Sequence, residues 1–247
     1  MKKMPLLVTG LVAVFLLAAG ALTMGADAER VPETDTDHDG MDDNWEKNYN
    51  LTVGENDAHQ DLDGDGMTNI EEFLKYTDPS NPEDSIRVKD NRMLVFIGVS
   101  IAMGVAAIMS SIGIGLAGAG ATGVAAERPD KFGRLIVYQA LPMTQGIYGL
   151  LVSILVLFFT GLTGGPEIAI LNSPYVGWGA LAIGIVIALS SVSAIPQGMT
   201  AAAAAAAFGR NNKVFGQGVI FSVMSETMAI FGFLVAIFLL LASGMLG

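Results

Sequence analysis

Acidic side chains occur in this 247-residue chain in two settings that suggest two kinds of ion chemistry. Glu226 is the one acidic residue within the apolar segments that make up the second half of the chain, which also contain Thr144, Gln145 and Gln197. A carboxylate at membrane depth costs several kcal/mol unless a proton, a metal ion or a partner neutralises it. We therefore interpret Glu226 as a carrier in ion movement through a membrane.

Two twelve-residue segments nearer the N-terminus have the spacing of a calcium-binding loop. They are DTDHDGMDDNWE, residues 35–46, and DLDGDGMTNIEE, residues 61–72. Calcium loops supply oxygen ligands at positions 1, 3, 5, 7 and 12 and a turning glycine at position 6, with position 9 a further ligand place. The predicted ligands are Asp35, Asp37, Asp39, the Met41 carbonyl and Glu46 in the first loop, and Asp61, Asp63, Asp65, the Met67 carbonyl and Glu72 in the second.

The alternative is an acidic, solvated linker whose Asp-Gly pairs only form turns. Calcium is favoured because a linker has no reason to repeat ligand spacing. The segment also resembles the calcium-binding repeats of exported prokaryotic proteins, both in DTDHDGMDDNWE and in NIEEFLKYTDPSNPEDS. Its clustered carboxylates would repel one another without metal, so we expect a small EF-hand-like helical head that folds with calcium.

The acidity of the chain is concentrated in and around this head. Residues 27–92 carry twenty acidic and six basic residues, within a chain whose net charge is −11. Such acidity argues against nucleic acid as a partner, because phosphate binding needs clustered Lys and Arg. No cysteine occurs, which excludes disulfide and thiolate chemistry.

A signal peptide is predicted over residues 1–28. Lys2 and Lys3 precede an apolar run that ends near Ala26-Asp27-Ala28, where cleavage is expected. An uncleaved signal anchor is the alternative. The head, residues 29–90, would then be exported.

Four apolar segments follow, at about residues 93–126, 134–162, 174–207 and 214–243, each long enough to cross a membrane. Their first and third connections hold the basic residues, which places those connections in the cytoplasm. The prediction is a multi-pass protein of the cell membrane with both mature termini outside the cytoplasm.

The four segments form two similar hairpins, residues 91–165 and 166–247. Ser110-Ser111 aligns with Ser190-Ser191, and Thr144 aligns with Thr227. Glycines in the first segment and alanines 201–207 in the third permit close helix packing. Because these small residues exceed the needs of one neighbour, we expect an all-α membrane protein whose copies assemble into a ring, with the first and third helices inside.

Three sequences in the hairpins, LPMTQGIYG at 141–149, IPQG at 195–198 and SETMAIFGF at 225–233, resemble the proteolipid, called c or K, of V-type and A-type rotary ATPases. The resemblance covers about residues 93–247. It implies a membrane rotor ring, a stator subunit whose arginine faces the ring, and central-stalk subunits at the cytoplasmic loops. Catalysis would lie on other subunits, and no nucleotide-binding Gly-rich loop occurs here.

The resemblance also implies an ion site. Glu226 would carry the ion, Thr144, Gln145 and Gln197 would lend side-chain oxygens, Leu141 its carbonyl, and Tyr148 a hydrogen bond to Glu226. Sodium, a hard cation, suits these oxygens. A proton-only site would need none of them, so sodium is favoured over H⁺. A membrane-anchored calcium protein and a stand-alone cation carrier are the rival interpretations.

Overall fold

The computed structural model describes residues 30–163, 170–171 and 173–246, so the predicted signal peptide lies outside the described residues. The chain divides after Ser80 into two compact units. The described residues contain helices and turns but no strand. The helices are α2 (Asp43–Asn48), α3 (Asn69–Lys75), α4 (Ile86–Glu127), η1 (Pro129–Lys131), α5 (Phe132–Ala140), η2 (Leu141–Met143), α6 (Thr144–Phe159), α7 (Val176–Ser191), α8 (Ala194–Arg210), η4 (Asn212–Val214), α9 (Phe215–Met224) and α10 (Thr227–Ala242).

The first unit is a head built on two short helices. Helices this short are not stable alone, so α2 and α3 depend on their caps and their core. Asp42 caps α2 by accepting hydrogen bonds from two backbone N–H groups, and Thr68 with Glu71 forms a capping box on α3. Trp45 and Phe73 pack edge to face, with ring centroids 5.2 Å apart, in a small buried core.

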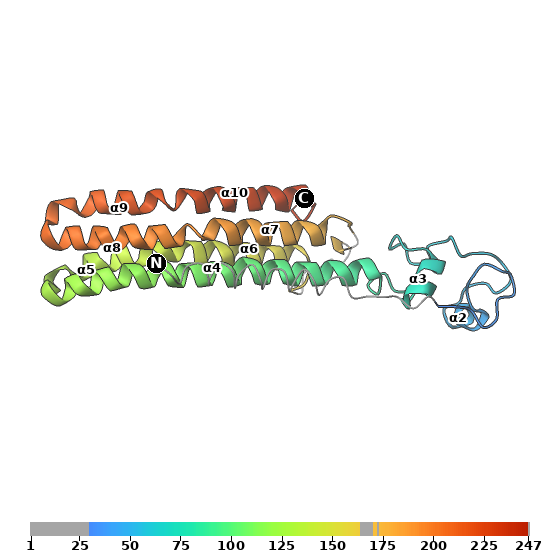
Figure 1. Cartoon of the computed structure of the whole chain (residues 1–247). Helices are drawn as coiled ribbons and strands as arrows, with labels where there is room; N and C mark the ends of the chain where they lie inside the picture. The colour runs from blue at the N-terminus through green and yellow to red at the C-terminus, as the bar shows by residue number, and fades with distance from the viewer. Residues whose placement is uncertain (1–29, 164–169, 172, 247) are drawn as a thin grey trace. The chain divides into compact units, whose positions relative to one another are not determined.

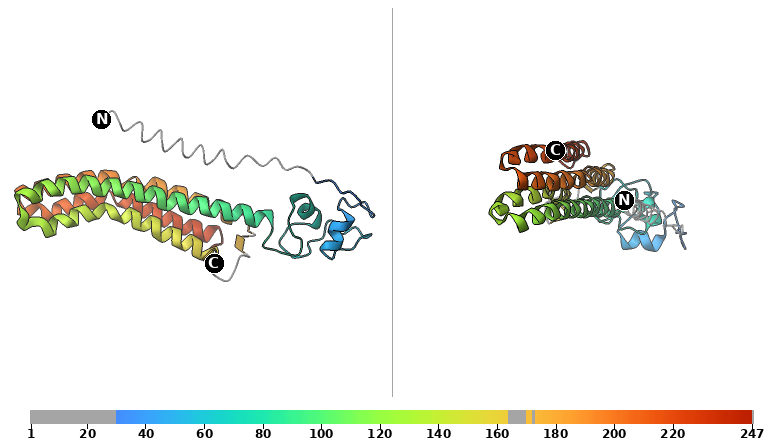
Figure 2. Two further views of the ribbon diagram at one scale, coloured as in Figure 1. Left: turned by 90° about the horizontal axis from the view of Figure 1, so that it is seen from below. Right: turned by 60° about the vertical axis from the view of Figure 1, so that its left-hand side comes forward.

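The second unit is a bundle of long apolar helices that run side by side (Figures 1 and 2). Three are long and apolar enough to cross a membrane: 88–127, 129–159 and 176–210. The pair α9 and α10, bent by 40°, makes a fourth span if it is counted as one. This arrangement confirms the prediction of an all-helical membrane protein.

Glycines let α4 approach α7 and α8 at backbone distance. A Cβ added to Gly98 would meet the Ala180 carbonyl, and one added to Gly198 would meet the Gly113 backbone, each well under 3.0 Å. Any larger residue would push the helices apart, because a backbone atom cannot move aside as a side chain can.

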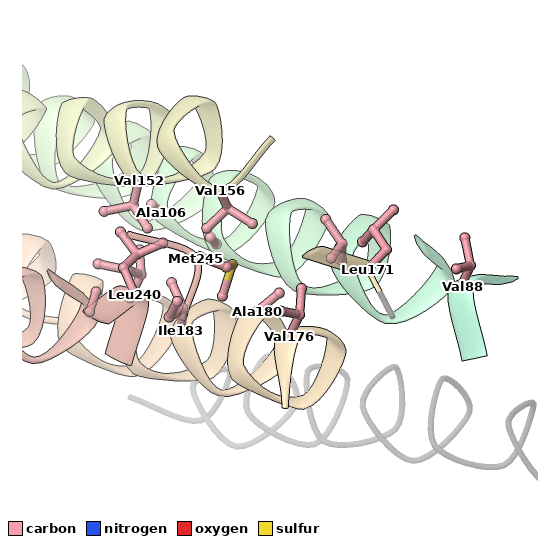
Figure 3. Packing of buried hydrophobic residues seen from close by; sticks show 14 residues of the cluster. Val88, Ala106, Val152, Val156, Leu171, Val176, Ala180, Ile183, Leu240 and Met245 are labelled. Carbon is pink, nitrogen blue, oxygen red and sulfur yellow. The ribbon is translucent and has the colours of Figure 1, made fainter. Parts of the chain in front are cut away.

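Apolar side chains from all four spans fill one half of the bundle. Val152 of α6, Ile183 of α7, Leu240 of α10 and Ala106 of α4 are buried together (Figure 3). These side chains hold the four helices in register.

Polar side chains join the helices near each end of the bundle. Asn91 donates through Nδ2 to the carbonyls of Leu171 and Ser173 at one end. Lys131 donates through Nζ to the carbonyls of Phe208 and Gly209 at the other, 2.9 and 2.8 Å away. The Lys131 ammonium group thereby supplies hydrogen bonds to carbonyls in the last turn of α8, which have no partner within the helix.

Candidate ion-binding sites

Three of the four membrane spans are interrupted near Glu226. Pro142 lies in η2 between α5 and α6, and Pro196 lies one turn after the break between α7 and α8. A proline has no N–H to donate, so each proline disrupts the regular helical bonding nearby. The third break, between α9 and α10, contains Glu226 itself and has no proline.

Glu226 is buried, with 8% of its surface exposed, and both of its carboxylate oxygens accept hydrogen bonds. Tyr148 Oη donates to Oε1 at 3.1 Å, and Gln197 Nε2 donates to Oε2 at 3.3 Å. Gln145 Nε2 in turn donates to Gln197 Oε1 at 2.7 Å. A phenol from α6 and a glutamine amide from α8 therefore donate directly to the carboxylate, and a second glutamine from α6 donates to that amide.

The remaining predicted residues extend this network. Thr144 Oγ1 lies 3.1 Å from the Leu141 carbonyl and 3.3 Å from Gln145 Oε1, and can donate to either. Ser193, which the sequence analysis did not single out, accepts from Gln145 Nε2 at 3.4 Å. Ser193 stands four residues before Gln197, a helical spacing that could have suggested it.

No cationic side chain is paired with Glu226 among the described residues. A buried carboxylate surrounded by neutral oxygens can be neutralised by one proton or one monovalent cation. A hard cation such as sodium suits oxygen ligands of this kind.

The two acidic loops of the head share one backbone conformation. In the first loop, Asp35 accepts from the N–H groups of His38 at 2.7 Å and Gly40 at 3.0 Å. In the second, Asp61 accepts from those of Gly64 at 2.7 Å and Gly66 at 2.9 Å. The four donors have positive φ, so positions 4 and 6 turn alike in both loops.

Carboxylates are buried in both loops without donors. Glu46 and Glu72 are 1% and 0% exposed, and among the described residues neither of them has a hydrogen-bond partner for either side-chain oxygen. Four other predicted ligands each have at least one buried side-chain oxygen without a hydrogen-bond partner among the described residues. They are Asp37, Asp39, Asp63 and Asp65. Burying so many unpaired oxygens is costly unless a cation binds them, and carboxylate oxygens are the ligands that calcium prefers.

The burial of these carboxylates also raises the pKa values of Glu46 and Glu72. Burial, together with the charges of Asp37 and Asp39, raises the pKa of Glu46 to about 7. Burial, together with Asp63 and Asp65, raises the pKa of Glu72 to about 8. The donor set therefore fits a divalent cation, which would remove both the desolvation penalty and the mutual repulsion.

Comparison with known proteins bears on the membrane unit. The family model of the ATP synthase C subunit matches residues 97–156 and again residues 181–239, which agrees with the predicted duplication of the hairpin. The A-type ATP synthase subunit K of Methanocaldococcus jannaschii is 44% identical over 151 residues, which is 61% of this chain and 63% of that protein. The V-type sodium ATPase subunit K of Enterococcus hirae is 34% identical over 146 residues, which is 57% of this chain and 88% of that protein.

The chain thus spans less than two thirds of the first relative and most of the second. The matches cover the helices that carry Glu226, Tyr148 and Gln197, and the family model begins after the acidic head. The chain therefore belongs to the family of ATP synthase C subunits.

Proposed function

We propose that this protein is a rotor-ring subunit of a V-type or A-type ATPase or ATP synthase, and that Glu226 carries the transported ion. The observation that supports this most is the convergence of Tyr148 and Gln197 on a buried carboxylate at the breaks of three spans. The protein is not an enzyme alone; other subunits of the complex would bind nucleotide.

Rotation follows from the electrostatics of the site. With a cation or proton bound, Glu226 is neutral and can face lipid as the ring turns. Without it, the carboxylate is charged and is stable only where water or a stator arginine compensates the charge. Occupancy is thereby coupled to the position of the site along the circumference of the ring.

Sodium is the proposed ion. The Enterococcus hirae relative belongs to a sodium ATPase. In this chain Gln197 contacts the carboxylate, Gln145 contacts Gln197, and Thr144 lies 3.3 Å from the Gln145 amide oxygen, which supports a site rich in neutral oxygens. An amide that donates to Glu226 offers its oxygen to a cation after a half turn of the side chain. A proton carrier would gain nothing from these oxygens and would carry the cost of burying them.

The second part of the proposal is an exported head, residues 29–90, that binds two calcium ions. The unpartnered buried oxygens of Glu46 and Glu72 support it. The predicted removal of residues 1–28 as a signal peptide, and the basic residues of the first and third connections, agree with a head outside the cytoplasm. Calcium would supply the positive charge that lets the acidic loops close.

The rotor proposal is tested by carbodiimide labelling of the intact complex in membranes. Dicyclohexylcarbodiimide should modify Glu226, and millimolar Na⁺ at neutral pH should slow the reaction severalfold, because bound sodium excludes the proton that the reagent requires. The Glu226→Gln variant should show no labelling and no transport. Equal labelling rates with and without Na⁺ would favour H⁺, and transport by the Glu226→Gln variant would contradict the rotor proposal.

A further inference from the structure

The two calcium loops differ at position 9. In the second loop this place is Asn69, which is buried and whose Oδ1 has no partner among the described residues. In the first loop it is Asp43, whose carboxylate accepts from the backbone N–H of Thr36 at 2.8 Å and from its hydroxyl at 2.7 Å. Both carboxylate oxygens of Asp43 are therefore already engaged with Thr36, at position 2 of the same loop, and are not free to serve as the position 9 ligand.

Asp57, which lies in neither loop, stands close to the first site. One carboxylate oxygen from each of Asp39, Glu46 and Asp57 can be chosen so that all three lie within 4.8 Å of one another. Asp57 is 7% exposed. Its Oδ2 accepts from the Thr52 N–H at 3.2 Å, while its Oδ1 is buried without a partner among the described residues. Nothing in loop spacing accounts for a third carboxylate buried against two predicted ligands.

Asn69 connects this aspartate to the second loop. Asn69 Nδ2 donates to the backbone carbonyl of Asp57 at 3.0 Å, and the N–H of Ile70 donates to the carbonyl of Ala58 at 3.0 Å. One amide side chain thus holds the backbone of Asp57 with its nitrogen and offers its oxygen at position 9 of the second loop. These two hydrogen bonds link the segment that contains Asp57 to the second loop.

We propose that Asp57 is a ligand of the calcium ion in the first loop, and that Asn69 fixes this ligand from the second loop, so that the two sites bind calcium cooperatively. The inference rests on the proposed calcium binding by the head. Five carboxylates and one carbonyl then surround the first ion, within the six to eight oxygens that calcium takes.

The ligand role is tested on the full chain in detergent by equilibrium dialysis with radioactive Ca²⁺. The wild type should bind two ions. Asp57→Asn should weaken one site about tenfold or more, because ligand charge sets calcium affinity. Glu55→Gln removes the same charge two residues away from an exposed position and should bind like the wild type. If Asp57→Asn also binds like the wild type, the inference is wrong, whereas a wild type that binds no calcium refutes the proposed calcium function itself.

Terbium luminescence separates a ligand from a structural residue. Terbium replaces calcium, Trp45 next to Glu46 can sensitise it, and lifetimes in H₂O and D₂O count metal-bound water. At saturating terbium, where the head is folded, Asp57→Ala should add about one water, since water takes the place of a lost ligand. Glu55→Ala should add none. An unchanged count in Asp57→Ala would overturn the ligand role even if affinity falls.

Cooperativity is tested through the second site. Glu72→Gln, which disables that site, should lower the calcium affinity of the first site about fivefold, the usual scale of coupling between linked sites. Unchanged affinity of the first site in Glu72→Gln would refute the coupling between the sites. The role of Asp57 as a ligand would still be decided by calcium dialysis and terbium luminescence.

Discussion

At the scale of single residues, the chain solves the burial of carboxylates in two ways. Glu226 is surrounded by neutral donors that can turn into acceptors, which suits an ion that must leave again. Glu46 and Glu72 have no donors among the described residues and lie beside other carboxylates, which suits a divalent ion that stays. The number of carboxylates that would face a bound ion distinguishes the two proposed sites.

The amide of Gln145 provides the first test at this scale. Gln145→Leu removes a neutral oxygen but keeps Glu226, so sodium protection of Glu226 against carbodiimide should weaken about tenfold or more while labelling itself persists. Gln139→Leu, an exposed change six residues earlier on the same span, is the matched control. Equal sodium protection in both variants would remove Gln145 from the site.

The head should respond to pH in opposite ways with and without metal. The folded, metal-free head holds protons on Glu46 and Glu72 with pKa values of about 7 and 8, above the ordinary 4.5. These protons stabilise it fully below about pH 4.5, and the stabilisation is lost as the pH rises through 7 and 8. Calcium competes with the same protons, so its affinity should instead rise from pH 5 to pH 8.

Limited proteolysis of residues 30–80 in chelator checks the first half of this prediction, and calcium titrations at several pH values check the second. Calcium affinity that stays constant between pH 5 and pH 8 would show that these two glutamates are not calcium ligands.

At the scale of elements, two groups can be distinguished among the glycines of α4. Gly98, Gly113 and Gly120 lie against the backbone of α7 or α8 within the chain. Gly104 and Gly115 are exposed, and a Cβ added to either would meet no atom within 4 Å. Open small residues on an apolar helix suit contact with another helix in the membrane, which supports the proposed ring.

These groups predict two different defects. Gly113→Leu should destabilise the chain itself by about 1–3 kcal/mol or more, because the side chain has no room. Gly115→Leu should leave the single chain folded and block the ring. Native gel electrophoresis of detergent extracts, with cell membranes probed for protein level, separates the two outcomes. A Gly115→Leu protein that still migrates as a ring would exclude this face from the contact between neighbouring copies.

At the scale of the molecule, the head and the bundle have separate cores. With calcium binding as proposed, the head would depend on charge neutralisation, whereas the bundle depends on apolar packing and on glycine contacts. We expect calcium chelation to expose residues 30–80 to trypsin without changing sodium protection of Glu226. Loss of that protection on chelation would show that the head controls the ion site.

Much of both sites could be predicted from the sequence because their signals are local. The twelve-residue spacing gives the candidate loop ligands, since the chain of such a loop turns so that alternate residues face inward. One glutamate in apolar helices, with the LPMTQGIYG and IPQG sequences, gives the family and the candidate residues. The membrane spans could be predicted from hydropathy, because each one is a continuous stretch of apolar residues long enough to cross a membrane.

Only the tertiary structure decided which distant residues meet. Asp57 lies beside Glu46 while the carboxylate of Asp43 accepts hydrogen bonds from Thr36, and no spacing rule distinguishes the two aspartates. The break at Glu226 has no proline to predict it, and Gly113 differs from Gly115 only in the face of α4 that it occupies. Spacing along the chain fixes what lies within a turn or a loop, whereas contacts between segments depend on how whole helices pack.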